Sequence, residues 1–145
     1  MVPPVRYNAR GVSNYDDPNT LRIDFASVYV TNPATDTGAS ISAKIAAGLH
    51  VILSPGNYNL QSPIVIAKPN IYVLGIGFPT LISANGNAVI TVGANGENVD
   101  GVRVAAVLLQ AGTKATKTLL QWGPAATSAK DAEQYPGSAA NPGFL

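Results

Sequence analysis

The residues able to carry acid–base chemistry are few, and two of them stand close together. Of the eight Asp and Glu residues, Glu97 and Asp100 lie in one segment rich in Gly and Asn. Hydrolysis of a polysaccharide requires two carboxylic acids about 5–5.5 or 6.5–9.5 Å apart across a groove. We therefore take Glu97 and Asp100 as candidate catalytic residues, a role that would place both beside Arg103 on an exposed face. In the alternative interpretation, Glu97 lies in a solvated loop and Asp100 satisfies the amides of a chain corner.

Aromatic side chains supply a second set of candidates. Tyr58, Tyr72 and Trp122 have flat apolar faces with a polar group at one end, which suits stacking on sugar rings. If they line one outer face of the molecule, they form a candidate ligand-binding surface. Packing in the core or at a strand edge is the alternative for each of them.

Other arrangements that carry chemistry are not recognisable. His50 is the single histidine and there is no cysteine, so neither a zinc-type centre nor a His-paired Ser nucleophile is predicted. The acid cluster that calcium binding requires is also missing. Gly75-Ile76-Gly77 continues into Phe78-Pro79 without a third glycine or a helix, so it is not a dinucleotide-binding loop. We expect no metal and no cofactor.

The composition points away from nucleic acids and membranes. Charged residues make up 12% of the chain, hydrophobic residues make up 46%, and the net charge is +1. The nine Lys and Arg residues are scattered, so no basic cluster is available to neutralise a row of phosphates. No apolar run approaches the roughly 18 residues of a membrane helix, and the segment Met1-Val2-Pro3-Pro4 shows no signal peptide.

Short apolar runs separated by Gly, Pro and Asn indicate an all-β fold. They fall into three sets of three: residues 50–53, 58–60 and 63–66; residues 71–74, 80–82 and 88–92; and residues 99–104, 107–110 and 118–122. The first runs of the sets begin about 21 and then about 28 residues apart, within the range of solenoid repeats. Asn70 and Asn98 precede the second and third sets and suit left-handed corners.

One helix is predicted, over residues 38–47, just before the first set of runs. Asp36 or Thr37 can cap its first amides, Ile41 and Ile45 share one face, and Gly48 suits a left-handed exit. A short amphipathic helix at this place would cover the open hydrophobic end of a coil. The favoured fold is a right-handed parallel β-helix of about three turns with an N-terminal capping helix. The alternative is an antiparallel β-sandwich of about nine strands.

The chain divides into an irregular arm (residues 1–26), a β-helix domain (27–123) and an irregular tail (124–145). Three turns leave an unpaired strand edge and an exposed aliphatic stack at the C-terminal side. The tail, rich in Pro, Gly and Ala, could fold back as a partial cover. If it does not, the chain is expected to self-associate through this end of the coil.

Residues 36–41 and 48–60 resemble the helix and first turn of pectate-lyase-like β-helix proteins, most specifically at the corner Pro55-Gly56-Asn57-Tyr58. Residues 69–77, 99–105 and 109–112 are similar to large secreted bacterial and fungal proteins named for a coagulation-factor-5/8-type carbohydrate-binding domain. The resemblance covers about two-thirds of the chain. It implies a right-handed parallel β-helix, secretion, and a polysaccharide ligand or substrate.

Members of that group are several times longer than this chain, so we interpret the chain as a fragment, and no catalytic residue is carried over from the family. Three functions follow as hypotheses. The first is an extracellular, carbohydrate-associated β-helix module that is non-catalytic as it stands. The second is a piece of a polysaccharide-degrading glycoside hydrolase or lyase, and the third is a structural, self-assembling β-solenoid.

Overall fold

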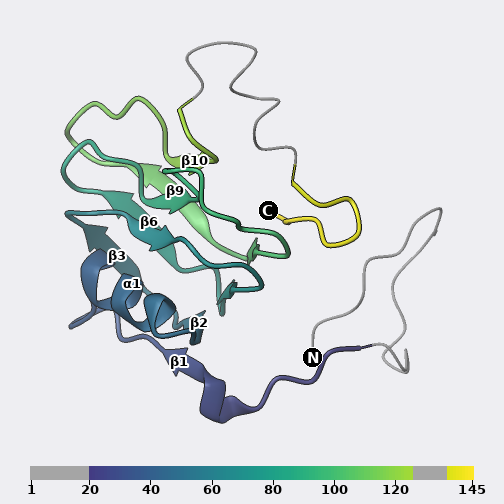
Figure 1. Cartoon of the computed structure of the whole chain (residues 1–145). Helices are drawn as coiled ribbons and strands as arrows, with labels where there is room; N and C mark the ends of the chain where they lie inside the picture. Colours follow the sequence, from purple (N-terminus) through teal and green to yellow (C-terminus); the bar gives the residue numbers. More distant parts are fainter. Residues whose placement is uncertain (1–19, 126–136) are drawn as a thin grey trace, which may run out of the picture.

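Short strands joined by tight corners wind into a parallel β-solenoid of about four turns (Figure 1). The computed structural model describes residues 20–125 and 137–145. The strands are β1 (Val28–Val30), β2 (His50–Leu53), β3 (Asn57–Leu60), β4 (Ile64–Ile66), β5 (Tyr72–Gly75), β6 (Thr80–Ser83), β7 (Ile90–Val92), β8 (Arg103–Ala105), β9 (Leu108–Ala111) and β10 (Leu120–Trp122). They are accompanied by a 3₁₀ turn, η1 (Phe25–Ser27), and one α-helix, α1 (Gly38–Ala46).

Each face of the coil is one parallel sheet. The sheets have the strand orders β1-β2-β5-β8, β3-β6-β9 and β4-β7-β10. Every strand therefore pairs with strands one turn away, which is possible only when the chain passes the same face once per turn. The predicted β-helix is confirmed, and the antiparallel sandwich is wrong. Three turns carry a strand on every face, and β1 with α1 adds the further, incomplete turn.

The core is a stack of aliphatic side chains inside the coil. Val51 pairs with Val73 and Val73 with Val104 along one sheet, and all three are buried. On another face Ile64 pairs with Ile90, and both are fully buried. Alternate residues of a strand point to opposite faces of its sheet. Each short strand thus contributes one or two inward side chains, and stacking them turn upon turn makes one continuous core.

Helix α1 closes the first end of this core. Thr37 is its N-cap and forms a capping box with Ser40, which satisfies the free amides of the first turn. Ile41 and Ile45 are 0% and 1% exposed, and the helix packs against β2 and β4. The prediction of a capping helix is confirmed, although its last residue is Ala46 and Gly48 makes the exit with φ +91°.

The corners before the second and third turns differ. Asn70 has φ +58°, as predicted, but the left-handed residue before the third turn is Gly101, with φ +68°. The expectation for Asn98 is wrong. Its side-chain oxygen accepts a hydrogen bond from the amide of Asp100 at 2.9 Å, so Asn98 forms an Asx turn instead of a left-handed corner. Within the run 99–104, only Arg103 and Val104 consequently belong to a strand, at the start of β8 (Arg103–Ala105).

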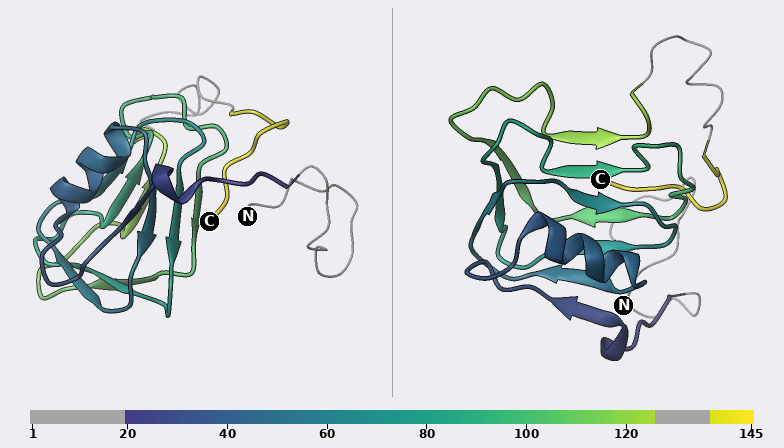
Figure 2. Two further views of the ribbon diagram at one scale, coloured as in Figure 1. Left: turned by 90° about the horizontal axis from the view of Figure 1, so that it is seen from below. Right: turned by 60° about the vertical axis from the view of Figure 1, so that its left-hand side comes forward.

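Residues 137–145, here called the strap, fold back onto the last described turn (Figure 2). The amide of Phe144 donates to Val102 O at 2.8 Å, and the amide of Val104 donates to Phe144 O at 2.9 Å. Phe144 thereby forms a parallel bridge with Arg103. The strap occupies the edge of β8 that sequence considerations left unpaired.

A cavity between the third turn and the strap as candidate functional site

A cavity of about 360 Å³ lies where the β7–β8 connection, the end of β10 and the strap meet. Three of the residues selected from the sequence, Glu97, Asp100 and Trp122, line it. Glycine and small residues form most of the remaining wall: Gly93, Gly96, Val99, Gly123, Pro124, Gly137, Ser138, Ala139, Pro142 and Gly143. The fold therefore brings together two acids and an indole that are separated by up to a full turn of chain.

Trp122 reaches the cavity because it is the last residue of β10. In the parallel pairing of β10 with β7 it stands opposite Val92, whose side chain is fully buried. The indole is 38% exposed and rests against the strap at Gly143. A Cβ on Gly143 would lie 2.4 Å from the Trp122 ring, so only glycine lets the strap approach the indole this closely.

The Glu97 carboxylate is held by a neighbouring asparagine. Its two oxygens accept from the Asn95 amide at 3.0 Å and from Asn95 Nδ2 at 2.9 Å. The side-chain hydrogen bond from Asn95, together with backbone hydrogen bonds, lowers the pKa of Glu97 below its ordinary value. A general acid in glycoside hydrolysis needs a raised pKa. Glu97 therefore fits the role of a fixed anionic acceptor and not that of the proton donor.

Asp100 stands at the corner that joins the cavity to the second turn. Its carbonyl accepts from the Asn70 amide at 2.8 Å, so its backbone satisfies the corner, and Asp100 also lines the cavity. The next residue, Gly101, donates its amide to Asn141 O at 2.8 Å. A Cβ at Gly101 would lie 2.4 Å from Asn70 Oδ1, and Asn141 Nδ2 donates to that same oxygen at 2.9 Å. The corner and the strap are thus fastened to each other.

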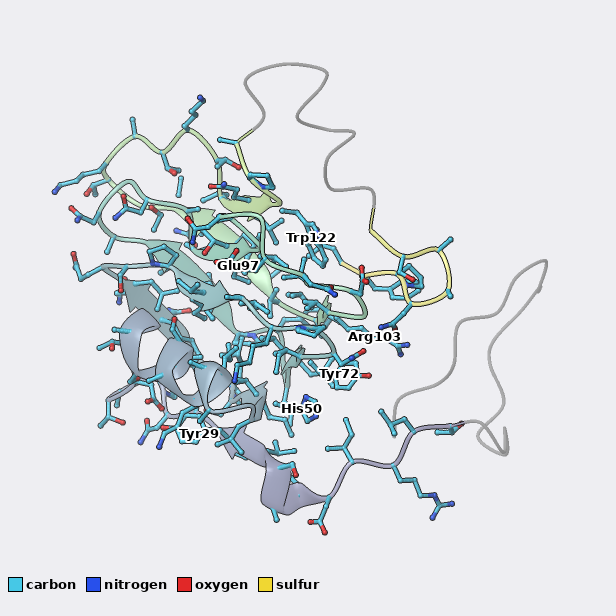
Figure 3. The ribbon with its side chains drawn as sticks, viewed as in Figure 1. Tyr29, His50, Tyr72, Glu97, Arg103 and Trp122 are labelled. Carbon is cyan, nitrogen blue, oxygen red and sulfur yellow. The ribbon has the colours of Figure 1, made fainter. Side chains whose placement is uncertain are left out.

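Arg103 is not among the described residues that line the cavity with the two acids, although a catalytic role would have placed it beside them. It belongs to a column of side chains on the outer face of the first sheet (Figure 3). Its guanidinium carbon lies 5.5 Å from the centre of the Tyr72 ring and 5.3 Å from that of Phe144. These are cation–π distances. Arg103 therefore holds the strap to the second turn and does not line the cavity.

The column continues downward to His50. The His50 and Tyr72 rings stack with their centroids 4.8 Å apart, and His50 Nδ1 accepts from the Tyr72 amide at 3.2 Å. Burial lowers the pKa of His50. With Nδ1 acting as acceptor, the neutral imidazole carries its proton on Nε2. These contacts explain His50 as a structural residue of the column.

Two of the three aromatic candidates are not available as sugar platforms in this structure. Tyr58 is 1% exposed, and its hydroxyl lies 2.5 Å from Thr31 Oγ1 and donates to Ser54 O at 3.0 Å. Tyr72 is 7% exposed, with its ring between His50 and Arg103. Interior packing explains the Pro55-Gly56-Asn57-Tyr58 corner: it delivers a tyrosine into the core where its hydroxyl finds partners. Trp122 alone of the three lines the cavity.

The strap is the part of the site that sequence reasoning missed. Ser138 and Gly143 line the cavity, yet the sequence offers no motif that assigns either to a site. The signal nearest to one is the change to Pro- and Gly-rich composition after Trp122. The part of the chain that the structure describes contains no group of three or more His, Asp and Glu side chains placed to hold a metal ion. In that same part, no helix has the length and hydropathy needed to cross a bilayer.

The stacked parallel sheets and the capping helix define a protein of the pectate-lyase-like β-helix class. The family model described as "LAM55 pectate lyase-like domain" matches residues 28–145, and the chain belongs to this family. The pectate-lyase-like resemblance is therefore confirmed. The matching model does not bear the coagulation-factor-5/8 name, so that narrower grouping is not supported.

A curated relative, "Exo-beta-1,3-glucanase" from Streptomyces sp. (strain SirexAA-E / ActE), is 37% identical over 124 residues. The match covers 85% of this chain and 20% of the relative, so the chain spans about one fifth of the curated relative's length. The solved structure of sacteLam55A from Streptomyces sp. SirexAA-E superposes with a TM-score of 0.81 at 35% identity, covering 97% of this chain and 24% of that one.

A variant of sacteLam55A refined in complex with glucose gives a TM-score of 0.79, also at 35% identity. That match covers 96% of this chain and 23% of the other. Both superpositions extend over nearly the whole described solenoid. The fold is thus shared with roughly a quarter of a longer protein.

Proposed function

We propose that this chain is a β-1,3-glucan-binding β-helix module of an extracellular glycoside hydrolase, non-catalytic by itself. The observation that carries the proposal is the 37% identity to an exo-β-1,3-glucanase over 85% of the chain. The cavity lined by Trp122, Glu97 and Asp100 adds support from the chain's own residues. Aromatic faces and fixed carboxylates are groups that recognise the apolar faces and hydroxyls of sugars.

The chemistry of the cavity favours binding over hydrolysis. Either mechanism of glycoside hydrolysis needs one protonated acid beside the leaving oxygen. The hydrogen bonds from Asn95 lower the pKa of Glu97, which is the opposite of the raised pKa that this role requires. In a longer protein, such as the relative of which this chain spans about one fifth, the proton donor would come from another region.

Retention on insoluble glucans tests the binding function. The whole chain is mixed with curdlan, a β-1,3-glucan, and in parallel with cellulose, a β-1,4-glucan, and the unbound protein is measured. We expect depletion by curdlan and not by cellulose. Equal recovery from both supernatants would contradict glucan recognition.

Release of reducing sugar from laminarin tests the non-catalytic part. We expect the rate with the chain to equal the rate of a blank without protein. Turnover above the blank that is lost in Glu97→Gln or Asp100→Asn, with folding unchanged by circular dichroism, would instead make these acids catalytic and move the chain to the hydrolase hypothesis.

Self-assembly is a second candidate function, favoured by one specific observation. Strands β9 and β10 are the last strands of their sheets, and Val107, Leu109, Leu119 and Leu120 pack on the core while only partly buried. Among the residues that the structure describes, no strand pairs with the outer edges of β9 and β10, and an edge of this kind can add another strand. Sedimentation velocity over a range of concentrations tests it: a growing weight-average mass is expected for assembly, whereas a monomer at the highest concentration contradicts it.

A further inference from the structure

We propose that the cavity at the third turn binds one pyranose residue of a neutral glucan, with the Trp122 face as the platform and the Glu97 and Asp100 carboxylates as acceptors for sugar hydroxyls. The inference rests on the proposed function and assigns it to a site. It also assigns the strap a role, because Ser138 and Gly143 complete the cavity wall.

The size and lining of the cavity fit a single sugar ring. Its volume of about 360 Å³ lies at the lower end of the roughly 300–1,000 Å³ usual for ligand sites. One wall is the Trp122 indole, which is 38% exposed. Several positions of the other walls are glycines, which have no side chain to fill the cavity. A ring can therefore lie flat on the indole while the polymer continues outward into solvent.

The charges in the cavity favour a neutral ligand. Two acids line it, and none of the described lining residues is Lys, Arg or His. A uronate or a phosphate would bring a third negative charge beside these two acids, and like charges at short range repel. Hydroxyl groups, in contrast, donate to carboxylates in short, charge-assisted hydrogen bonds.

A divalent cation fits the same acids less well. Calcium needs six to eight oxygen ligands, whereas the cavity offers two carboxylates, one of which already accepts two hydrogen bonds from Asn95. Each carboxylate oxygen has two lone pairs, so Glu97 can still accept from one or two hydroxyls. Because Asn95 already fixes the Glu97 side chain, little side-chain entropy remains to be lost on binding.

The cavity wall is complete only while the strap is docked on the coil. Gly143 rests on the Trp122 ring, and Ser138 Oγ accepts from the Asn141 amide at 3.3 Å. Asn141 in turn bonds to Gly101 and Asn70 across the corner. The wall therefore exists only while this network, together with the Arg103–Phe144 contact, is formed.

Fluorescence provides a direct test because Trp122 is the only tryptophan in the chain. The full chain is titrated with laminaritriose while the emission of Trp122 is recorded, and binding is checked by calorimetry. We expect a saturable shift of emission in the wild type and in the matched control Phe25→Ala, which changes an exposed aromatic residue away from the cavity. Glu97→Gln should raise Kd about tenfold, because a charge-assisted hydrogen bond is lost.

Two further comparisons test the class of ligand and separate the assignment of the cavity from the proposed function of the chain. An oligosaccharide of glucuronate should bind at least tenfold more weakly than laminaritriose, and equal or tighter binding of the acidic sugar overturns the assignment to a neutral glucan. If curdlan retains the chain while Trp122 emission never saturates with laminaritriose, the cavity is not the site, but the proposed function stands. If neither binding is observed, both are rejected.

Discussion

The two ends of the described solenoid are closed by different chemistry. At the first end, α1 places Ile41 and Ile45 over the coil, both almost completely buried. At the other end, the strap is joined by backbone hydrogen bonds and by the contact of Arg103 with Phe144, while Phe144 itself remains 43% exposed. One closure depends on burial of apolar surface, and the other depends on polar and cation–π contacts.

The difference explains where the candidate site lies. Helix α1 packs Ile41 and Ile45 onto an aliphatic stack, so the main contribution of that end is burial of apolar surface. The strap is rich in glycine and contacts the coil at separate points, which leaves a cavity bordered by Glu97, Asp100 and Trp122. The candidate function therefore sits where the closure of the core is least complete, an arrangement expected of binding regions.

The largest effect is expected at the helical end. Ile45→Ala removes a buried side chain from the contact of α1 with the coil, which should lower the free energy of unfolding by about 2–5 kcal/mol. Urea denaturation measures it. Val65→Ala, on β4 but 38% exposed, is the matched control and should cost clearly less. Equal losses in the two variants would mean that α1 does not seal the core.

A smaller effect is expected at the strap. Arg103→Ala removes the cation between Tyr72 and Phe144, which should cost about 0.5–2 kcal/mol. Because the Phe144 amide donates to Val102, hydrogen exchange at that amide should accelerate in the variant. The amide of Ile64, which donates to Val89 O on the far face, should keep its protection relative to global unfolding. Unchanged exchange at Phe144 would show that Arg103 does not fasten the strap.

Asp36 supplies polar contacts at the helical end, so its substitution tests how far that end depends on hydrogen bonds as well as on apolar burial. Its carboxylate accepts from the Tyr29 hydroxyl at 2.9 Å, the Asn32 amide at 2.8 Å and Ser40 Oγ at 2.8 Å. Partial burial raises its pKa, but the hydrogen bonds from Asn32, Ser40 and Tyr29 outweigh burial and lower the pKa overall. Because Asp36 is largely in contact with solvent, we expect Asp36→Asn to cost about 0.5–1 kcal/mol at neutral pH.

The pH dependence of that cost follows from the direction of the shift. A carboxylate with a lowered pKa stabilises the fold above its ordinary pKa, and the contribution is lost as the pH falls through the lowered value. Unfolding midpoints in urea at pH 7 and at progressively lower pH should therefore converge for wild type and Asp36→Asn. A difference that persists in strong acid would contradict this origin.

The smallest effect is expected from His50 in the outer column. Burial lowers its pKa, so the unfolded chain binds the proton more readily than the folded chain. Stability should then fall as the pH drops through the ordinary histidine value of about 6.5. Comparison of Tm at pH 7.5 and pH 5.5 measures it, and His50→Gln should remove this component. An unchanged pH response in His50→Gln would assign it to other groups.

Sequence patterns were sufficient for the coil and for the corner at Asn70, but not for every corner. Aliphatic runs such as 50–53 and 71–74 recur once per turn, and burial requires the same periodicity, so the strands could be placed. Asn98 could not be placed correctly, because its side chain accepts the Asp100 amide and leaves the left-handed position to Gly101. A choice between two residues that both suit a corner depends on local hydrogen bonds and not on composition.

The candidate site could likewise be predicted from the sequence only in part. Glu97, Asp100 and Trp122 were selected by residue type, and they do share a cavity. Tyr58 and Tyr72 were selected by the same reasoning but are buried. Residue type thus identified side chains capable of binding sugars, and burial separated those that can meet a ligand from those that hold the coil together.

By itself, then, the sequence determined the parallel coil, its capping helix and the absence of cysteine chemistry, because these follow from hydrophobic periodicity, local capping and composition. Only the tertiary structure decided that the strap returns to β8, that Arg103 holds it, and that two acids meet an indole in one cavity. Those features join residues far apart in the chain through individual contacts. Such contacts leave no periodic trace in a sequence, since each is made once.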